Sequence, residues 1–206
     1  MATALVLNSS ITGPSSVSRT LVAEIVAQLR AETPGLDIIE RDLGAAPIPH
    51  LTPDTIGGFA KEQPEGAEAE TRALSDALIA ELFAADILVI GAPMYNFGMP
   101  SPLKAWFDHV LRAGVTFRYT ESGPEGLATG KRAIVVETRG GLYSEGPLAF
   151  LDAQEPHLRA VLGFIGITDV TFVRAEKLAF GPDVRAESIA KAREAIAEGS
   201  ALARAA

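Results

Sequence analysis

A hydroxyl-rich segment near the start of the chain has the composition of an anion-binding loop. This segment, Asn8–Ser18, follows a short apolar run and precedes a helical pattern. Hydroxyls, backbone N–H groups and the positive end of a helix dipole all favour a phosphate. The loop has no Walker A Lys, and the chain has no Gly-x-Gly-x-x-Gly motif, so we expect neutral donors to hold a phosphate monoester. The serines could instead only cap the helix.

A second segment, Gly91–Pro100, combines a rigid backbone with aromatic side chains. Pro and Gly restrain an exposed backbone, and the segment leads directly into a helical pattern. Tyr95 and Phe97 offer faces to a flat ring, while amides near Asn96 offer donors to ring heteroatoms. The alternative is a structural loop anchored by one aromatic side chain.

A third segment, Thr138–Gly141, ends in two glycines. Paired glycines allow the backbone to approach a ligand closely and to donate N–H groups to it. A Gly-Gly pair is a weak signal by itself. Its position after a strand pattern, like that of the other two segments, is what makes it a candidate.

Other chemistries lack the residues that they need. The chain has no Cys, which excludes disulfides, thiolate metal sites and a cysteine nucleophile. Its three His have no metal-ligand spacing, and there is no Gly-x-Ser-x-Gly elbow of a serine hydrolase. We therefore expect no metal and no catalytic side chain that bonds to the substrate.

Charge and hydropathy restrict the partners and the compartment. The net charge is −8, and Lys and Arg form no cluster, so nucleic acid and anionic lipid are not expected partners. The start of the chain does not resemble a signal peptide. The longest apolar core, Ile87–Ile90, is far shorter than the roughly 20 residues that cross a bilayer. These features predict a soluble cytoplasmic protein.

Two hydrophobic periodicities alternate along the chain and predict strands and helices in turn. The strand patterns are apolar at nearly every position, as in strands covered on both faces. They are Ala4–Leu7, Leu36–Glu40, Ile87–Ile90, Ala133–Glu137 and Val170–Val173. The helical patterns are Leu21/Ile25/Leu29, Leu74/Leu78/Leu82, a helix with Ser101 as N-cap and Pro102 in its first turn, a helix within Leu148–Phe164 interrupted near Pro156, and one from about Asp183 to Leu202.

This alternation predicts a single α/β domain, residues 1–206, with a flavodoxin-like doubly wound five-stranded parallel sheet. In such sheets ligands bind at the carboxyl ends of the strands, which would bring the three candidate segments together. Two long connections need separate explanations. Val115–Gly130 alternates and then turns, which predicts a hairpin inserted before the fourth strand. Gly44–Gln63, rich in Pro and Gly, is predicted to be a surface loop or lid.

Motifs along almost the whole chain match one enzyme family. They are Met94–Phe97, Leu103–Trp106, Arg112–Thr120, Gly123–Gly126, Arg139–Gly141 and Leu162–Asp169. In these motifs the chain resembles the FMN-dependent NADH azoreductases, which also reduce quinones. The resemblance implies a homodimer with flavin sites at the subunit interface.

The resemblance also implies which residues bind FMN. Those for the phosphate are Ser10, Ser16, Val17 and Ser18; those that frame the isoalloxazine ring are Met94, Tyr95, Asn96 and Phe97; those at its pyrimidine end are Thr138, Arg139, Gly140 and Gly141. Two positions depart from the family. Thr138 replaces a common Ser and keeps the hydroxyl, while Val161 replaces a Phe that lines the substrate pocket in several relatives, which leaves substrate preference open.

The function implied is FMN-dependent reduction of quinones and azo compounds by NADH or NADPH. No second nucleotide motif is present, so donor and acceptor are expected to use one flavin face in turn, with ping-pong kinetics. Phe97, Phe117 and Tyr119 are predicted to enclose the flat substrate, although Phe117 and Tyr119 could instead form hairpin core against a helix or a partner subunit.

Two other functions use the same cofactor. One is a flavodoxin-like electron carrier or FMN-binding module that acts with a protein partner; the other is a flavin reductase that releases reduced FMN. A carrier needs little substrate pocket, and the aromatic hairpin and the Pro-rich loop argue against it because both resemble walls of a cavity.

Overall fold

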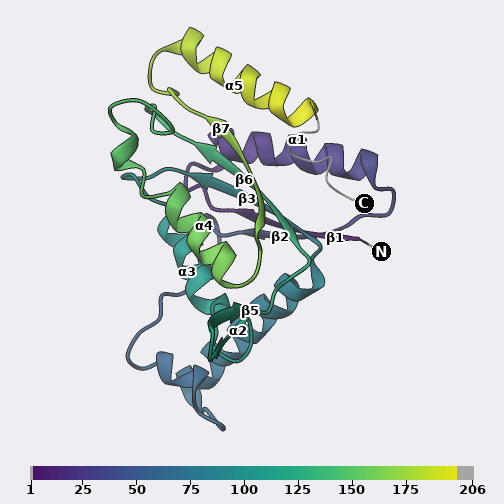
Figure 1. Cartoon of the computed structure of the whole chain (residues 1–206), viewed down its shortest axis with the longest axis vertical. Helices are drawn as coiled ribbons and strands as arrows, with labels where there is room; N and C mark the ends of the chain where they lie inside the picture. Colours follow the sequence, from purple (N-terminus) through teal and green to yellow (C-terminus); the bar gives the residue numbers. More distant parts are fainter. Residues whose placement is uncertain (1, 199–206) are drawn as a thin grey trace.

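A parallel sheet between two layers of helices forms the body of the protein (Figure 1). The computed structural model describes residues 2–198. Its main sheet has the strand order β2-β1-β3-β6-β7, and every neighbouring pair is parallel. The strands are β1 Thr3–Asn8, β2 Asp37–Asp42, β3 Ile87–Pro93, β6 Arg132–Thr138 and β7 Asp169–Ala175. The predicted flavodoxin-like, five-stranded doubly wound sheet is therefore confirmed.

Each face of the sheet is covered by its own group of helices. Helices α1 and α5 lie on one face and α2, α3 and α4 on the other, and a separate hydrophobic core fills each side (Figure 1). The helices are α1 Val17–Glu32, α2 Gly66–Ala84, α3 Ser101–Val110, α4 Glu155–Phe164 and α5 Pro182–Ala197, with short 3₁₀ turns η1 Gly13–Ser15, η2 Ile56–Phe59 and η3 Ala149–Leu151. The apolar stripes of the sequence account for these two cores.

The two edge strands differ from their predicted environment, and in β7 only Val173 and Ala175 are buried. The central strands β1, β3 and β6 are buried along nearly their whole length, as their apolar sequences predict. In contrast, no residue of β2 is buried. The expectation that all strands are covered on both faces is wrong for β2, because it lies at the edge of the sheet and Asp37, Glu40 and Arg41 meet solvent there.

Two helix boundaries differ from the sequence prediction. Pro100, and not Ser101, is the N-cap of α3, and no side chain caps this helix. Pro156 lies in the first turn of α4, where its missing N–H costs nothing, so it starts the helix rather than interrupting it. Helix α5 is described as far as Ala197, and the predicted end at Leu202 lies outside the described residues.

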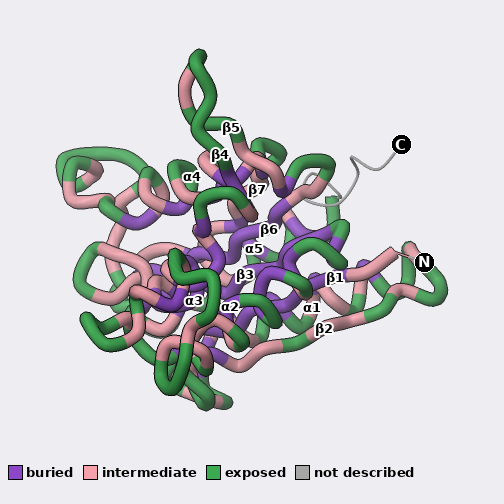
Figure 2. Tube along the Cα trace, turned by 90° about the horizontal axis from the view of Figure 1, so that it is seen from below, coloured by how far each residue is buried: buried purple, intermediate pink, exposed green. Residues whose placement is uncertain are grey.

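The two long connections have different structures. Strands β4 Phe117–Thr120 and β5 Gly123–Gly126 form the predicted antiparallel hairpin, which stands out from the body with an exposed tip (Figure 2). The loop before α2 is tied to its neighbours: His109 Nε2 donates to Pro49 O at 2.9 Å, and Arg72 donates to Gly58 O at 2.7 Å. These hydrogen bonds hold the loop against α2 and α3. Within residues 2–198, no helix is both long and apolar enough to cross a membrane.

Candidate functional site

A cavity of about 290 Å³ lies at the carboxyl ends of the central strands, where the three candidate segments meet. It is lined by Ser10, Thr12, Ser15, Ser16 and Val17 from the first segment, Pro93, Met94 and Tyr95 from the second, Thr138, Arg139 and Gly140 from the third, and Leu178 and Arg185 near the start of α5. These segments lie far apart in the sequence. Their meeting follows from the parallel order of β1, β3, β6 and β7, which directs all these strand ends to one edge.

The first segment presents hydroxyls and free backbone donors to the cavity. Ser16 is the N-cap of α1, where its side chain accepts the Arg19 N–H at 3.3 Å. The Ser16 and Ser18 hydroxyls are buried and lie 3.0 Å apart. Because Val17 and Ser18 belong to the first helical turn, their N–H groups have no carbonyl partner within the helix. Ser16 therefore caps the helix, and the donors beside it can still bind an anion.

Tyr95 joins the first segment to the second. Its hydroxyl lies 3.3 Å from Ser10 Oγ and accepts the Ile11 N–H at 3.2 Å. Ser10 is buried and also contacts the Thr12 hydroxyl at 3.0 Å. The side chain of Tyr95 thus closes the cavity wall between the ends of β1 and β3.

The second segment contains a tight turn with an uncommon backbone. Tyr95 and Gly98 exchange two backbone hydrogen bonds, at 3.0 and 3.1 Å. The two residues between them, Asn96 and Phe97, have φ angles of 49° and 71°, in the left-handed region. A bulky side chain such as that of Phe97 rarely adopts this conformation, and such strain is common at ligand sites. The turn leaves the Phe97 ring 42% exposed, in edge contact with Tyr143.

Backbone hydrogen bonds fix the third segment between its neighbours. Thr138 O accepts the Met94 N–H at 2.9 Å, which connects this segment to the second one. On the other side, Leu178 N donates to Arg139 O at 3.1 Å and Ala179 N to Gly140 O at 3.1 Å. The peptide groups of the Gly-Gly pair are therefore held by the segment that follows β7.

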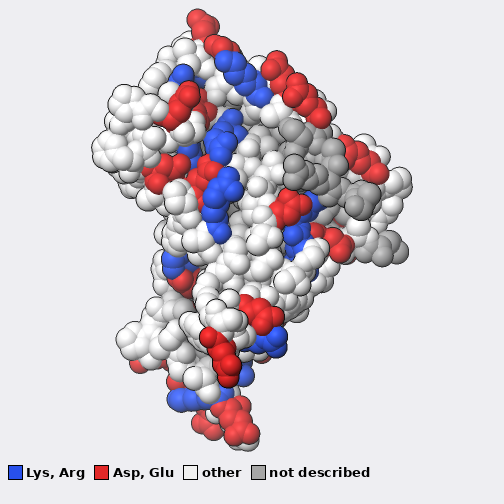
Figure 3. Space-filling model, viewed as in Figure 1, with Lys and Arg blue, Asp and Glu red and all other residues white. Residues whose placement is uncertain are grey.

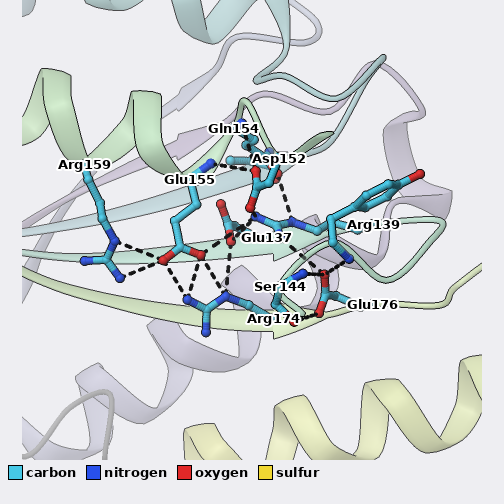
Figure 4. A network of polar contacts seen from close by, with 11 residues as sticks. Glu137, Arg139, Ser144, Asp152, Gln154, Glu155, Arg159, Arg174 and Glu176 are labelled. Carbon is cyan, nitrogen blue, oxygen red and sulfur yellow. Dashed lines mark hydrogen bonds and ion pairs between the residues drawn. The ribbon is translucent and has the colours of Figure 1, made fainter. Parts of the chain in front are cut away.

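A buried network of charges lies beside the cavity, around the side chain of Arg139 (Figure 4). The guanidinium has no exposed surface and pairs with Glu137 at 2.7 Å and Asp152 at 3.0 Å. It also donates to Glu176 and to Gln154, each at 3.2 Å. Since these partners come from β6, the segment before α4 and the end of β7, Arg139 holds three parts of the chain together. The positive charge of Arg139 is paired with these buried carboxyl groups and is not available to a ligand.

The pKa values of two carboxylates of this network, Glu137 and Glu176, are shifted in opposite directions. Burial raises the pKa of Glu137 to about 8, although the charge of Arg139 acts in the other direction. Burial also acts to raise the pKa of Glu176, but hydrogen bonds from the Ser144 hydroxyl and the Tyr143 N–H outweigh it and the net shift is downward. Glu137 Oε1 is buried without a hydrogen-bond partner among the described residues, which agrees with a carboxyl that resists ionisation.

The structure brings most of the predicted cofactor residues to the cavity, with some exceptions. Those that line it are Ser10, Ser16, Val17, Met94, Tyr95, Thr138, Arg139 and Gly140; those of the same segments that lie outside its wall are Ser18, Asn96, Phe97 and Gly141. The side chain of Arg139 cannot face a ligand, because it has no exposed surface and its guanidinium is enclosed in the buried network.

The three remaining predicted residues lie away from the cavity wall. Phe117 is only 8% exposed and packs against Phe164 of α4, as the hairpin-core alternative expects. Its neighbour Tyr119 is 73% exposed. Val161 is half-buried and packs on the core under α4. Within one chain, therefore, the hairpin aromatics contact each other and Phe164, while the Phe97 ring contacts Tyr143.

Sequence reasoning missed some residues of the cavity. Thr12 and Ser15 belong to the predicted hydroxyl-rich segment and could have been named. Arg185 carries no local signal, since it is one of several charged residues on an amphipathic helix. The signal that could have found it is topological: Gly181-Pro182 starts a helix just after the last strand, at the ligand edge of the sheet.

Comparison with known proteins gives consistent matches over nearly the full length. A family model described as a flavodoxin-like fold matches residues 2–199. The FMN-dependent NADH:quinone oxidoreductase of Hyphomonas neptunium is 55% identical, with 96% of this chain and 95% of that protein covered. The protein of the same name from Ralstonia nicotianae is 53% identical, over 92% and 93%. A crystal structure of an azoreductase from Bacillus anthracis has a TM-score of 0.88 at 31% identity, over 96% of this chain and 98% of that one.

Proposed function

This chain belongs to the flavodoxin-like family of FMN-dependent NADH:quinone oxidoreductases, and we propose that it is an enzyme that carries two electrons from NADH or NADPH through bound FMN to quinones and azo compounds. The observation that carries this function is the cavity where the three strand-end segments converge. Its hydroxyls and aromatic rim have the chemistry that a phosphorylated flat cofactor needs.

The residues present fit FMN. The hydroxyls of Ser10 and Ser16 and the unpaired N–H groups at the start of α1 suit the phosphate. Next to them, the left-handed turn at Asn96 and Phe97 leaves the N–H groups of both residues outside its two cross-turn bonds, which makes them available to ring heteroatoms. When bound, FMN supplies the hydride-transfer chemistry, and the protein supplies position and electrostatics.

The chain's own residues orient the two substrates at the same place. Phe97, two residues after Tyr95 of the cavity wall, is 42% exposed and offers a face to the nicotinamide of the donor or to the ring of the acceptor. No second nucleotide motif is present in the sequence to hold the donor separately. Donor and acceptor therefore occupy this position in turn, and the first product leaves before the second substrate binds.

A homodimer completes this site. Tyr119 on the projecting hairpin and Phe150 in η3 are 73% and 80% exposed, so both rings are free to contact a partner subunit. In a dimer these rings would meet the partner subunit and cover its open cavity. A cytoplasmic location, where NADH and NADPH are produced, is part of the proposal.

Steady-state kinetics test the proposed function directly. The purified protein with FMN should oxidise NADH in the presence of a soluble quinone or an azo dye without any protein partner. Double-reciprocal plots at several acceptor concentrations should be parallel, as expected for substrates that bind in turn. A protein that binds FMN but does not oxidise NADH with either acceptor would instead be an electron carrier.

The dimer is tested by light scattering coupled to size-exclusion chromatography. We expect twice the mass of one chain, and substitution of Tyr119 by Ala should slow turnover more than it weakens FMN binding. A monomer that turns over at the full rate would contradict the shared site.

A further inference from the structure

Two arginines line the cavity, but only one of them keeps its charge available. Arg139 is enclosed by Glu137, Asp152 and Glu176 and has no exposed side-chain surface. Arg185, in the first turns of α5, has a single long hydrogen bond, from Nη1 to Leu178 O at 3.4 Å. Among the described residues, no carboxylate pairs with it within 4.0 Å. Arg185 is therefore a free cation at the edge of the cavity.

Arg19, a basic residue near the start of α1, is already paired with a carboxylate. Arg19 lies in the first turn of α1, but its Nη2 binds Asp42 at 2.6 Å. It lines a different hollow, with Ala23 and Glu40, on the side of the edge strand. Arg19 thus adds little positive potential to the cavity that holds Ser16.

The ligand expected there needs a counter-charge. A phosphate monoester carries about −1.5 to −2 charges at neutral pH. The serine hydroxyls are neutral, and the N-terminus of α1 contributes the equivalent of only about half a positive charge. The chain as a whole has a net charge of −8, and acidic and basic side chains are interspersed on the face shown in Figure 3. A phosphate monoester bound only by these hydroxyls and the helix N-terminus would therefore lack about 1 to 1.5 positive charges.

We propose that Arg185 supplies this charge and is the residue that selects the phosphorylated flavin, FMN, over riboflavin. The inference rests on the proposed function. The guanidinium can exchange its long bond to Leu178 O for a charge-assisted bond to a phosphate oxygen, which is shorter and stronger. The location of Arg185 on α5 makes the last helix a part of the cofactor site, together with the serines at the start of α1.

Flavin titration of the full-length protein, freed of bound flavin, tests this role. The variants are Arg185→Met and Arg185→Gln, which remove the charge, and Arg185→Lys, which keeps it. The matched control is Arg30→Met. Arg30 is exposed in the last turn of α1, 13 residues from Val17 and therefore roughly 20 Å along the helix from the cavity. Dissociation constants for FMN and riboflavin are measured by flavin fluorescence at low and high salt.

We expect both charge-removing variants to bind FMN at least about 10-fold more weakly, with riboflavin affinity changed less than about 2-fold. Arg185→Lys should retain most of the preference for FMN, and Arg30→Met should behave as the wild type. The affinity of the wild type for FMN should fall with salt more steeply than that of Arg185→Met, because an ion pair is screened.

Results of the flavin titration could overturn the role of Arg185 without affecting the proposed function. One is an unchanged affinity for FMN in both charge-removing variants; the other is an equal loss of FMN and riboflavin affinity, which would indicate a packing role. A changed preference for NADPH over NADH at constant FMN affinity would assign the charge to the donor and also overturn the proposal. If the wild type binds neither flavin, the proposed function itself fails.

Discussion

The two arginines of the cavity, Arg139 and Arg185, have different surroundings. Comparing them distinguishes a residue that stabilises the fold from one that is available to bind a ligand. Arg139 is fully buried and is held by carboxylates and an amide from three parts of the chain. Arg185 is half-buried and has one weak bond to a carbonyl. Removing a buried cation leaves its buried anionic partners without a counter-charge, which destabilises the fold. Removing a cation that has no anionic partner leaves no buried charge uncompensated. The first residue should therefore matter for stability and the second for the ligand.

The largest expected effect is on the stability of the fold. Arg139→Met should lower the free energy of unfolding by about 3–5 kcal/mol, because Asp152 and Glu176, which are almost fully buried, would lose their counter-charge. Arg185→Met should change it by less than about 0.5 kcal/mol. Urea unfolding of the flavin-free proteins, followed by circular dichroism, gives both values. Equal small effects would remove the distinction between the two arginines.

The next effect concerns the neutral donors of the cavity. Replacing Ser16 and Ser18 together with Ala should weaken FMN binding by about 1–3 kcal/mol, the range for lost hydrogen bonds to a charged group. The flavin-free fold should survive, with about 1 kcal/mol lost because the N-cap of α1 is removed. Fluorescence titration measures the binding, and Ser122→Ala, at the exposed hairpin tip, serves as control. If FMN affinity does not change, the serines have only the capping role.

The last effect is a dependence of stability on pH that comes from the buried network. Burial raises the pKa of Glu137 from its ordinary value of 4.5 to about 8 in the folded protein. Between these values the unfolded chain releases a proton that the folded protein keeps. This contribution to stability is therefore complete below about pH 4.5 and is lost as the pH rises through 8.

Glu137→Gln should remove this part of the pH dependence. For one proton the slope is at most about 1.4 kcal/mol per pH unit. Urea unfolding of the two proteins over the same pH range measures the difference. We expect the curve of the variant to be flatter than that of the wild type across the interval. Parallel curves would show that Glu137 is ionised in the folded protein, held by Arg139, and that the buried network has no proton to release.

Much of this protein could be predicted from local sequence patterns. The apolar runs that became β1, β3 and β6 are buried strands, and the alternation in Phe117–Thr120 became a hairpin strand. Because parallel strands direct their carboxyl ends to one edge, the strand order also predicted that the segments around Ser10, Tyr95 and Thr138 would meet there. Hydrophobic periodicity predicts which side chains are buried, and this pattern can be read from a short stretch of sequence.

Other features depended on contacts between distant residues. The side chain of Arg139 lies in the buried network and not toward the cavity, because Glu137 and Asp152 are brought to it by β6 and by the segment before α4. The left-handed turn at Asn96 and Phe97 is set by the surrounding structure, since neither residue prefers that conformation strongly enough to show it in the sequence. Arg185 reaches the cavity only because α5 packs against α1 beside β7. A sequence pattern specifies which face of a helix is buried, but the partner that each exposed charge meets is decided by how the elements pack.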